Sequence, residues 1–357
     1  MRKKEFLMFG VFISLLLVLL VFAAPSLTTV TLTSSSATNT TAENLTVTTD
    51  QDDNASVKLI YNWYSNDDSI AVLNMPMDGG SDNSFAKDYS GYDNNISARN
   101  GNPVWNATGG YDGFGAFEFD GHNNDFYIID GDSSIDLTEE LTISMWVKPN
   151  IVYPTGGNTP FINRQAGGGD SYWFGIHLSG KFLMGSFGGN IQGTNTSWTA
   201  GQWYHVAGTY RDLDGVYSGE LYINGVEEVL TVDNYDNMAG SASQELFLGG
   251  SSNSDDFNGT IDEVMIFNRT LSQEQILALY ENKTDLIVSQ ETTLNDVWNV
   301  TVTPNDGSQD GTTLWSNTLT ILEEAAEEPE AVPEFSDYAI ALLLLTVVGG
   351  FFFMRKK

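Results

Sequence analysis

The chain has 357 residues, of which 47 are Asp or Glu and only 15 are Lys or Arg, so its formal net charge is −32. Such an acidic chain lacks the basic surface that binding to nucleic acid phosphates requires, and we expect no nucleic acid partner. The absence of cysteine excludes disulfides, thiolate metal ligands and a cysteine nucleophile. The hydrophobic fraction of 41% is sufficient for about two packed domains.

Residues 1–24 have the pattern of a secretory signal peptide. A basic start, Arg2-Lys3-Lys4, precedes an apolar run over residues 6–24 that ends in small residues suited to cleavage. The run is also long enough to be an uncleaved membrane anchor. Both interpretations predict that the chain is exported.

The C-terminal part predicts a stalk followed by a membrane segment. Residues 323–334 are rich in Glu, Ala and Pro, a composition that favours an extended, self-repelling acidic stalk. Residues 335–357 contain an apolar run followed by three cations, which predicts a C-terminal transmembrane helix whose basic end stays in the cytoplasm.

The order Pro-Glu-Phe (residues 333–335), apolar run and basic cluster resembles the PEF-type C-terminal sorting signals of archaeal surface proteins. This resemblance implies that a membrane transpeptidase processes the tail, and a plain single-pass anchor is the alternative. Ten Asn-x-Ser/Thr sequons fit a glycosylated protein at the cell surface. They are at Asn39, Asn44, Asn54, Asn95, Asn106, Asn195, Asn258, Asn268, Asn282 and Asn299.

Between these ends, apolar and polar residues alternate with period two, which predicts an all-β region. Residues 141–147 and 220–224 are typical of half-buried strands. Asn224-Gly225 predicts a tight hairpin turn, because both central residues of a type I′ turn need positive φ. One short helix is expected, with Ser272 as its N-cap, Gln275 as the reciprocal partner of a capping box, and an apolar stripe behind them.

A series of motifs in residues 69–283 resembles the laminin-G-like, concanavalin A-like jelly roll. The resemblance covers about 215 residues and implies a β-sandwich of two large sheets. Phe117, Phe119, Trp146 and Trp203 are expected to fill the space between the sheets. The motifs, in chain order, are GAFEFDG (115–121), FYII (126–129), LTISMWVKP (141–149), WYHVAGTY (203–210), LYINGV (221–226) and GTIDEVMIF (259–267).

The sequence does not complete a catalytic site. Some glycoside hydrolases of this architecture carry Glu-x-Asp-x-Glu on one strand, with the outer carboxylates as acid and nucleophile. Here Glu118 and Asp120 match, but His122 replaces the last carboxylate. His205 is flanked by apolar residues and is expected to be a hydrogen-bonded core residue. We therefore predict that the protein is not an enzyme.

The jelly-roll resemblance implies one structural calcium ion between the first and last strands. The matching positions are Asp78, Asp88 and Asp262, and carboxylates are the ligands that this hard cation prefers. The alternative is that Asp262 caps a turn and Asp88 is a solvated loop residue.

Four residues are candidates for a ligand-binding face: Arg164, Tyr172, Trp173 and Trp198. Exposed aromatic rings stack on the apolar faces of sugars, and Arg binds hydroxyl or carboxylate groups. The alternative is that these are ordinary core and rim residues.

The two flanks of this region share a second pattern. Joined across the gap, residues 27–66 and 284–322 resemble one immunoglobulin-like sandwich. The resemblance implies that Val47 and Val300 take the positions of the usual Cys pair, and that Trp63 is the buried core tryptophan. The jelly roll would then be an insertion in this smaller domain. The alternative is two unstructured flanks.

Together these patterns predict a non-catalytic binding or adhesion protein, anchored in the membrane on the outer face of the cell. Its laminin-G-like domain, stabilised by Ca²⁺, is expected to bind carbohydrate or a surface protein. A structural envelope spacer and a surface glycoside hydrolase are the alternatives.

Overall fold

The computed structural model describes residues 23–51, 56–78, 86–122, 124–153, 157–166, 169–186, 188–238, 240, 243–251 and 256–324. The expected signal peptide, apart from its last two residues, lies outside this range, as do most of the stalk and the whole C-terminal segment. No helix within the described part has the length and apolarity needed to cross a membrane. The described residues form an all-β structure with one α-helix, α1 (Gln273–Tyr280), and one short 3-10 helix, η1 (Ser289–Glu291).

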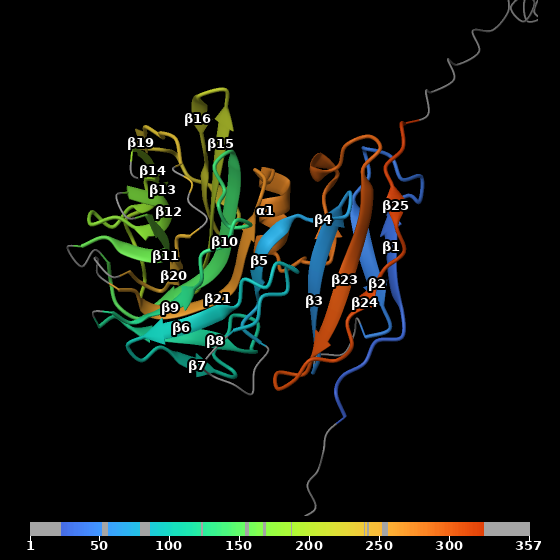
Figure 1. Ribbon diagram of the computed structural model, residues 1–357, viewed down its shortest axis with the longest axis horizontal. Coiled ribbons are helices and arrows are strands. Elements are labelled where there is room, and N and C mark those ends of the chain that lie inside the picture. Colours follow the sequence, from blue (N-terminus) through green and yellow to red (C-terminus); the bar gives the residue numbers. More distant parts are fainter. Residues whose placement is uncertain are drawn as a thin grey trace, which may run out of the picture.

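Two large antiparallel sheets and helix α1 form the central part of the chain, residues 71–280, which we call the module (Figure 1). The first has nine strands, and its main path runs β18 (Val226–Glu227), β17 (Leu221–Ile223), β15 (Tyr204–Leu213), β10 (Glu140–Pro149), β21 (Asn258–Phe267), β8 (Ala116–Asp120), β7 (Val104–Asn106). In addition, β16 (Val216–Ser218) pairs with β15, and β5 (Ala71–Met75) pairs with β21.

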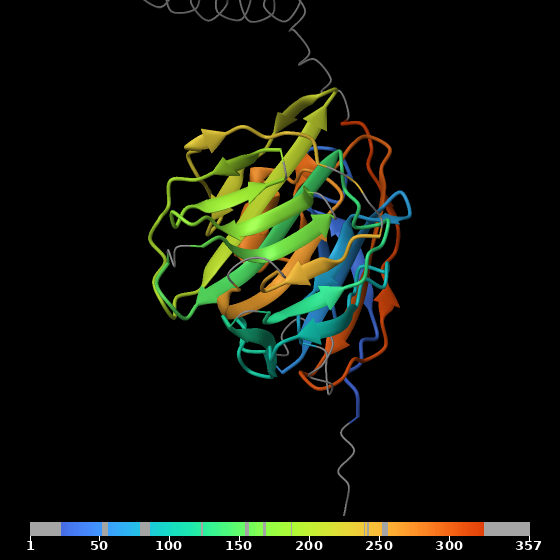
Figure 2. The ribbon, with the colours of Figure 1, turned by 60° about the vertical axis from the view of Figure 1, so that its left-hand side comes forward.

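The second sheet has eight strands and lies toward the viewer in Figure 2. Its order is β19 (Val232–Asp233), β14 (Asn190–Gln192), β13 (Phe182–Gly185), β12 (Gly169–Ile176), β11 (Thr159–Ala166), β20 (Leu246–Leu248), β9 (Phe126–Ile129), β6 (Ile96–Asn100). The expected hairpin joins β17 to β18, and Asn224 and Gly225 both have positive φ, at 53° and 73°.

The main core lies between these two sheets, as alternation predicts. Phe117 and Phe119 belong to it, as expected. Trp146 does not, because its neighbours Met145 and Val147 face the core and successive side chains of a strand alternate. Trp146 instead stacks on Tyr111, with ring centroids 3.4 Å apart. Trp203 is half-buried, with its ring edge-on to Tyr111.

The flanks form a second, smaller sandwich in which both sheets contain strands from both sides of the module (Figure 1). One sheet has the order β1 (Val30–Ser34), β2 (Leu45–Thr49), β22 (Leu286–Ile287). In the other, β3 (Lys58–Ser65) pairs along its whole length with β23 (Val297–Asn305). The shorter strands β4 (Asp68–Ser69), β24 (Leu314–Trp315) and β25 (Leu319–Thr320) complete this second sheet.

The core of the small sandwich continues into the outer side of the module. Val47, Val300 and Trp63 are buried in one cluster, where Trp63 meets the ring of Trp298 edge-on at 6.3 Å. The same cluster includes residues of β21 and α1 from the module. The two sandwiches therefore share an apolar core through the helix that lies between them.

Helix α1 begins as predicted but uses its glutamine differently. The Ser272 Oγ accepts a hydrogen bond from the Gln275 backbone N–H at 3.2 Å. The Gln275 side chain does not accept a hydrogen bond from the Ser272 backbone N–H, as a capping box would require. Its amide donates to the Leu286 carbonyl at 3.0 Å and accepts from the Val288 N–H at 2.9 Å, which fixes the helix to the small sandwich.

Candidate functional site

The outer face of the eight-stranded sheet, turned away from the main core, carries one of the four predicted ligand residues. Tyr172 and Trp173 are consecutive on β12, so their side chains must point to opposite faces. Tyr172 is fully buried in the main core, while Trp173 lies outside that core and is half-buried. The sheet therefore presents Trp173, and not Tyr172, on its outer face.

A row of side chains crosses this outer face beside Trp173. Asn163 on β11 pairs with both Trp173 and Phe247, and Phe247 pairs with Ile128. Directly paired residues of antiparallel strands share one face. We call the four residues Ile128, Phe247, Asn163 and Trp173 the outer row.

Asn163 is the polar member of the outer row. It is 6% exposed, and its Oδ1 is buried without a hydrogen-bond partner among the described residues. A buried acceptor that lacks a partner costs about 1–3 kcal/mol, and either an ordered water molecule or a ligand hydroxyl can supply the donor for this oxygen. The row thus combines an indole ring, two apolar side chains and one free amide oxygen.

The other three predicted ligand residues are structural. Tyr172 donates from its hydroxyl to the Ile135 carbonyl at 3.1 Å. Trp198 is 2% exposed and donates from its indole to the Gly180 carbonyl at 2.8 Å. Arg164 is fully buried and forms an ion pair with Asp136 at 2.7 Å. None of the three therefore presents an exposed face to a sugar, which corrects the sequence-based expectation.

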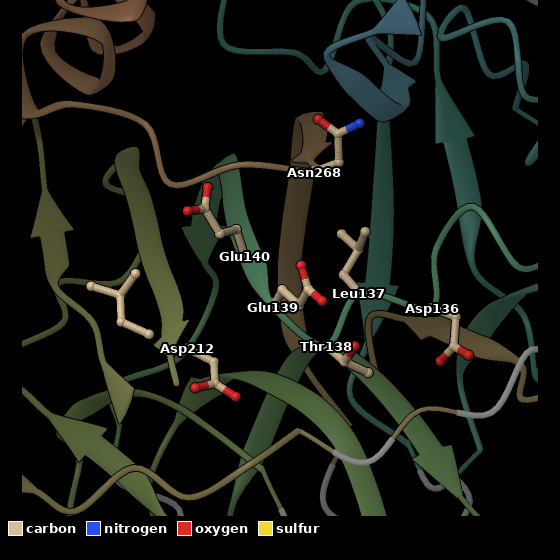
Figure 3. A pocket seen from close by; sticks show the side chains of 8 residues that line it. Asp136, Leu137, Thr138, Glu139, Glu140, Asp212 and Asn268 are labelled. Carbon is tan, nitrogen blue, oxygen red and sulfur yellow. The ribbon is translucent and has the colours of Figure 1, made fainter. Parts of the chain in front are cut away.

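An open acidic cavity of about 490 Å³ lies near the Arg164–Asp136 pair (Figure 3). Its carboxylates can accept hydrogen bonds from hydroxyl groups, but Asp136 is paired with Arg164, and Glu140 accepts from Arg211 at 3.0 Å. Among the described residues that line the cavity none is aromatic, so it offers no stacking surface. The lining residues are Asp136, Leu137, Thr138, Glu139, Glu140, Asp212, Leu213 and Asn268.

A second acidic cluster contains two of the three predicted calcium ligands, but a lysine occupies its centre. Lys58 of the small sandwich forms ion pairs with Asp78 at 2.8 Å, with Asp112 at 2.5 Å and with Glu263. Oxygens of these three carboxylates lie within 4.8 Å of one another. Asp262, also fully buried, accepts from the backbone N–H groups of Tyr111 and Glu263. We call Asp78, Asp112, Asp262 and Glu263 the carboxylate cluster.

Local backbone geometry brings two of these carboxylates to Lys58. Glu263 has φ of 53° in the middle of β21, next to a break in the register with β10. Such a β-bulge re-aims a side chain that regular alternation would direct elsewhere. Met77, just before Asp78, has φ of 63°. Glu263 and the neighbour of Asp78 thus both adopt the left-handed region, which is typical of a constrained site.

Electrostatics in the cluster are dominated by burial and by the lysine. Burial raises the pKa of Asp78 to about 6, although the Lys58 ammonium opposes this shift. Burial also raises the pKa of Asp262 well above its usual value. The pKa of Lys58 is raised, because the attraction of the surrounding carboxylates outweighs its own burial.

These residues do not fit a calcium ion. Calcium takes six to eight oxygen ligands, whereas an ammonium carrying three donors stands among the carboxylates. The third predicted ligand, Asp88, is occupied elsewhere. Its carboxylate accepts from the backbone N–H groups of Asn74, Ser90 and Asn94 and from the Ser90 hydroxyl. Asp88 is thus a buried residue that organises its own loop, not the solvated one that the alternative expected.

The residues of the incomplete catalytic motif also have partners nearby. Glu118 accepts from the Asn106 amide at 2.7 Å. Asp120 pairs with His122 at 2.8 Å, and both side chains are largely exposed. The buried His205 bonds Ser144, as its structural interpretation predicts.

Residues 120–277 match the family of concanavalin A-like lectins and glucanases. This part of the chain is therefore a domain of that superfamily, as the motifs and the paired sheets indicate. Among curated proteins, none matches the chain.

Several solved structures are similar to part of this chain at low identity. Domain 4 of an extracellular arabinanase from Geobacillus stearothermophilus, in complex with arabinotriose, is 21% identical with a TM-score of 0.45, and the match covers 59% of this chain and 98% of that one. The binding domain of a paraclostridial mosquitocidal protein is 16% identical with a TM-score of 0.43, covering 60% and 52%. A Trypanosoma rangeli sialidase is 16% identical with a TM-score of 0.43, covering 60% of this chain but only 33% of that protein.

Proposed function

We propose that the protein is a non-catalytic carbohydrate-binding protein that acts outside the cell, and that its glycan site is the outer row centred on Trp173. The observation that carries this proposal is the unpartnered buried oxygen of Asn163 beside a half-buried indole. A sugar supplies both complements, because its C–H face packs on an aromatic ring and its hydroxyl donates to an amide oxygen.

The ligand is expected to be a neutral glycan. With a net charge of −32, the protein repels sialylated or uronic acid-containing chains at long range. The outer row itself offers no cation, since its members are aromatic, aliphatic or amide side chains. The extracellular location follows from the export and sorting patterns in the sequence, and we further propose that the small sandwich is of the immunoglobulin type.

Substitution of Trp173 tests the site. Trp173→Ala should weaken binding to neutral oligosaccharides, arabinotriose among them, by about 30-fold, as expected for the loss of an aromatic anchor worth about 2 kcal/mol. Asn163→Ala should weaken it by about tenfold. Binding is measured on a glycan array and then by calorimetry with the best oligosaccharide.

The matched control is Trp198→Phe, which alters a buried tryptophan on the inner side of the module. It should lower the Tm and leave glycan binding unchanged. Full binding by Trp173→Ala would contradict the site, and release of reducing sugar by the wild-type protein would contradict the non-catalytic assignment.

A structural spacer is the second candidate, and one observation favours it. The small sandwich and the module share a continuous apolar core, as a rigid envelope component requires. Absence of binding to any glycan, together with self-assembly of the full-length chain, would favour this function over glycan binding.

A further inference from the structure

We propose that the Lys58 ammonium takes the place of a metal ion at the carboxylate cluster, so that the cluster is the docking site of the small sandwich and not a calcium site. This inference is independent of the glycan site, which lies on the other sheet of the module. It assigns a function to four acidic residues that the proposed binding activity does not use.

The partners come from different parts of the molecule. Lys58 is the first residue of β3, and its register partner on β23 is Asn305. Asp78, Asp112 and Glu263 belong to the module and follow Lys58 by 20, 54 and 205 positions. The ion pairs therefore tie the end of β3 in one sandwich to strand β21 and two loops of the other.

The ammonium donates hydrogen bonds to Asp112 and Glu263 and forms an ion pair with Asp78, so its charge complements that of the cluster. A lysine carries three N–H donors, and three carboxylates lie around its Nζ. All four side chains are nearly buried, with 0–13% of each exposed. A buried carboxylate cluster requires a compensating cation, and Lys58 supplies a positive charge from within the chain.

Calcium and lysine are consequently alternatives at the same place. A divalent ion bound among these oxygens would lie against the ammonium, and the two like charges would repel each other at short range. Removal of the ammonium should convert the cluster into a cation site, because three carboxylate oxygens would remain within 4.8 Å of one another.

The test compares the thermal stability of the full-length chain with EDTA and with millimolar Ca²⁺. The wild-type Tm should not differ between the two conditions. Lys58→Ala should lower the Tm in EDTA by about 10 °C, because unpaired charges remain buried, and Ca²⁺ should restore part of that loss. Lys58→Ala combined with Glu263→Gln should respond less to Ca²⁺.

The matched control is Lys87→Ala. Lys87 also pairs across the two parts, with Asp310 at 2.7 Å, but half of its side chain is exposed. Its loss should change the Tm by no more than about 1–2 °C and create no response to Ca²⁺.

Two results would overturn the proposal. One is a wild-type Tm that rises with Ca²⁺ and loses this rise in Asp78→Asn, and this measurement decides even if Lys58→Ala does not fold. The other is a folded Lys58→Ala protein whose Tm equals that of the wild type and ignores Ca²⁺.

Discussion

His205 shows how one buried residue makes the stability of this fold depend on pH. It is 1% exposed, and its Nε2 is hydrogen bonded to the Ser144 hydroxyl at 2.9 Å. Its Nδ1 has no hydrogen-bond partner among the described residues. The residue lines a cavity of about 10 Å³, near the lower limit for one water molecule. Burial lowers the pKa of His205 to about 3.

The sign of the resulting pH dependence follows from proton uptake. Between pH 6.5 and pH 3 the unfolded chain binds a proton at this position and the folded chain does not. The stability contributed by neutral His205 is therefore complete above pH 6.5 and is lost as the pH falls, by up to about 1.4 kcal/mol per pH unit. Asp78 acts in the opposite direction between pH 6 and 3.8, because its raised pKa lets the folded form hold a proton.

A comparison with His205→Gln isolates the contribution of this histidine to the pH dependence of stability. The free energy of unfolding of the wild type, minus that of the variant, should decrease by about 3 kcal/mol between pH 6.5 and 4. Urea unfolding at a series of pH values measures this difference. A difference that stays constant over the range would show that His205 titrates normally in the folded protein.

At the scale of single elements, alternation along β12 decides which predicted residues can bind a ligand. The sequence singles out Tyr172 and Trp173 as a pair because both are aromatic and lie near a Gly-rich loop. Only the position of β12 in the sheet decides which of the two side chains faces the core, because adjacent residues of a strand face opposite sides. Asn163 was missed because an isolated Asn carries no motif, although the pairing of β11 with β12 places it beside Trp173.

Helix α1 gives a prediction at the same scale. Gln275→Leu should destabilise the protein by about 2–4 kcal/mol, because the half-buried Leu286 carbonyl and the buried Val288 N–H lose their partner. Chemical denaturation measures the change. Gln273→Leu, an exposed position on the same helix, is the control and should change stability by less than about 0.5 kcal/mol. Equal effects of the two substitutions would contradict the bridging role.

At the scale of the whole molecule, the shared core predicts that the two sandwiches unfold together. Trp298 is fully buried and contacts Trp63 and Arg269. Trp298→Ala should cost about 3–5 kcal/mol and reduce hydrogen-exchange protection both in β23 and in β10 of the module. The exposed Trp315 of the same sandwich provides the control, Trp315→Ala. Two separate transitions, with only one of them shifted, would contradict this coupling.

The layered architecture could be predicted from the sequence, but the contact between the two sandwiches could not. Period-two alternation and turn residues are local signals, and they indicate the strands of both sandwiches. Lys58 carries no such signal, because its partners lie up to 205 positions away and only the docked sandwiches bring them together. The resemblance implied Asp78 and Asp262 as calcium ligands, and the structure places both carboxylates in the cluster around Lys58.

The course of the chain through the small sandwich has a mechanical consequence. The described chain enters at one end of this sandwich before β1 and leaves at the opposite end after β25 (Figure 1). Strands β3 and β23 are paired over eight positions and close the chain on either side of the insertion. A tensile force applied between residues 23 and 324 would load the pairing of β1 with β2 and of β25 with β23 first, and the β3–β23 ladder after them. The lectin-like fold would lie outside the path that bears the force, and it would keep its shape until β3 and β23 were pulled apart.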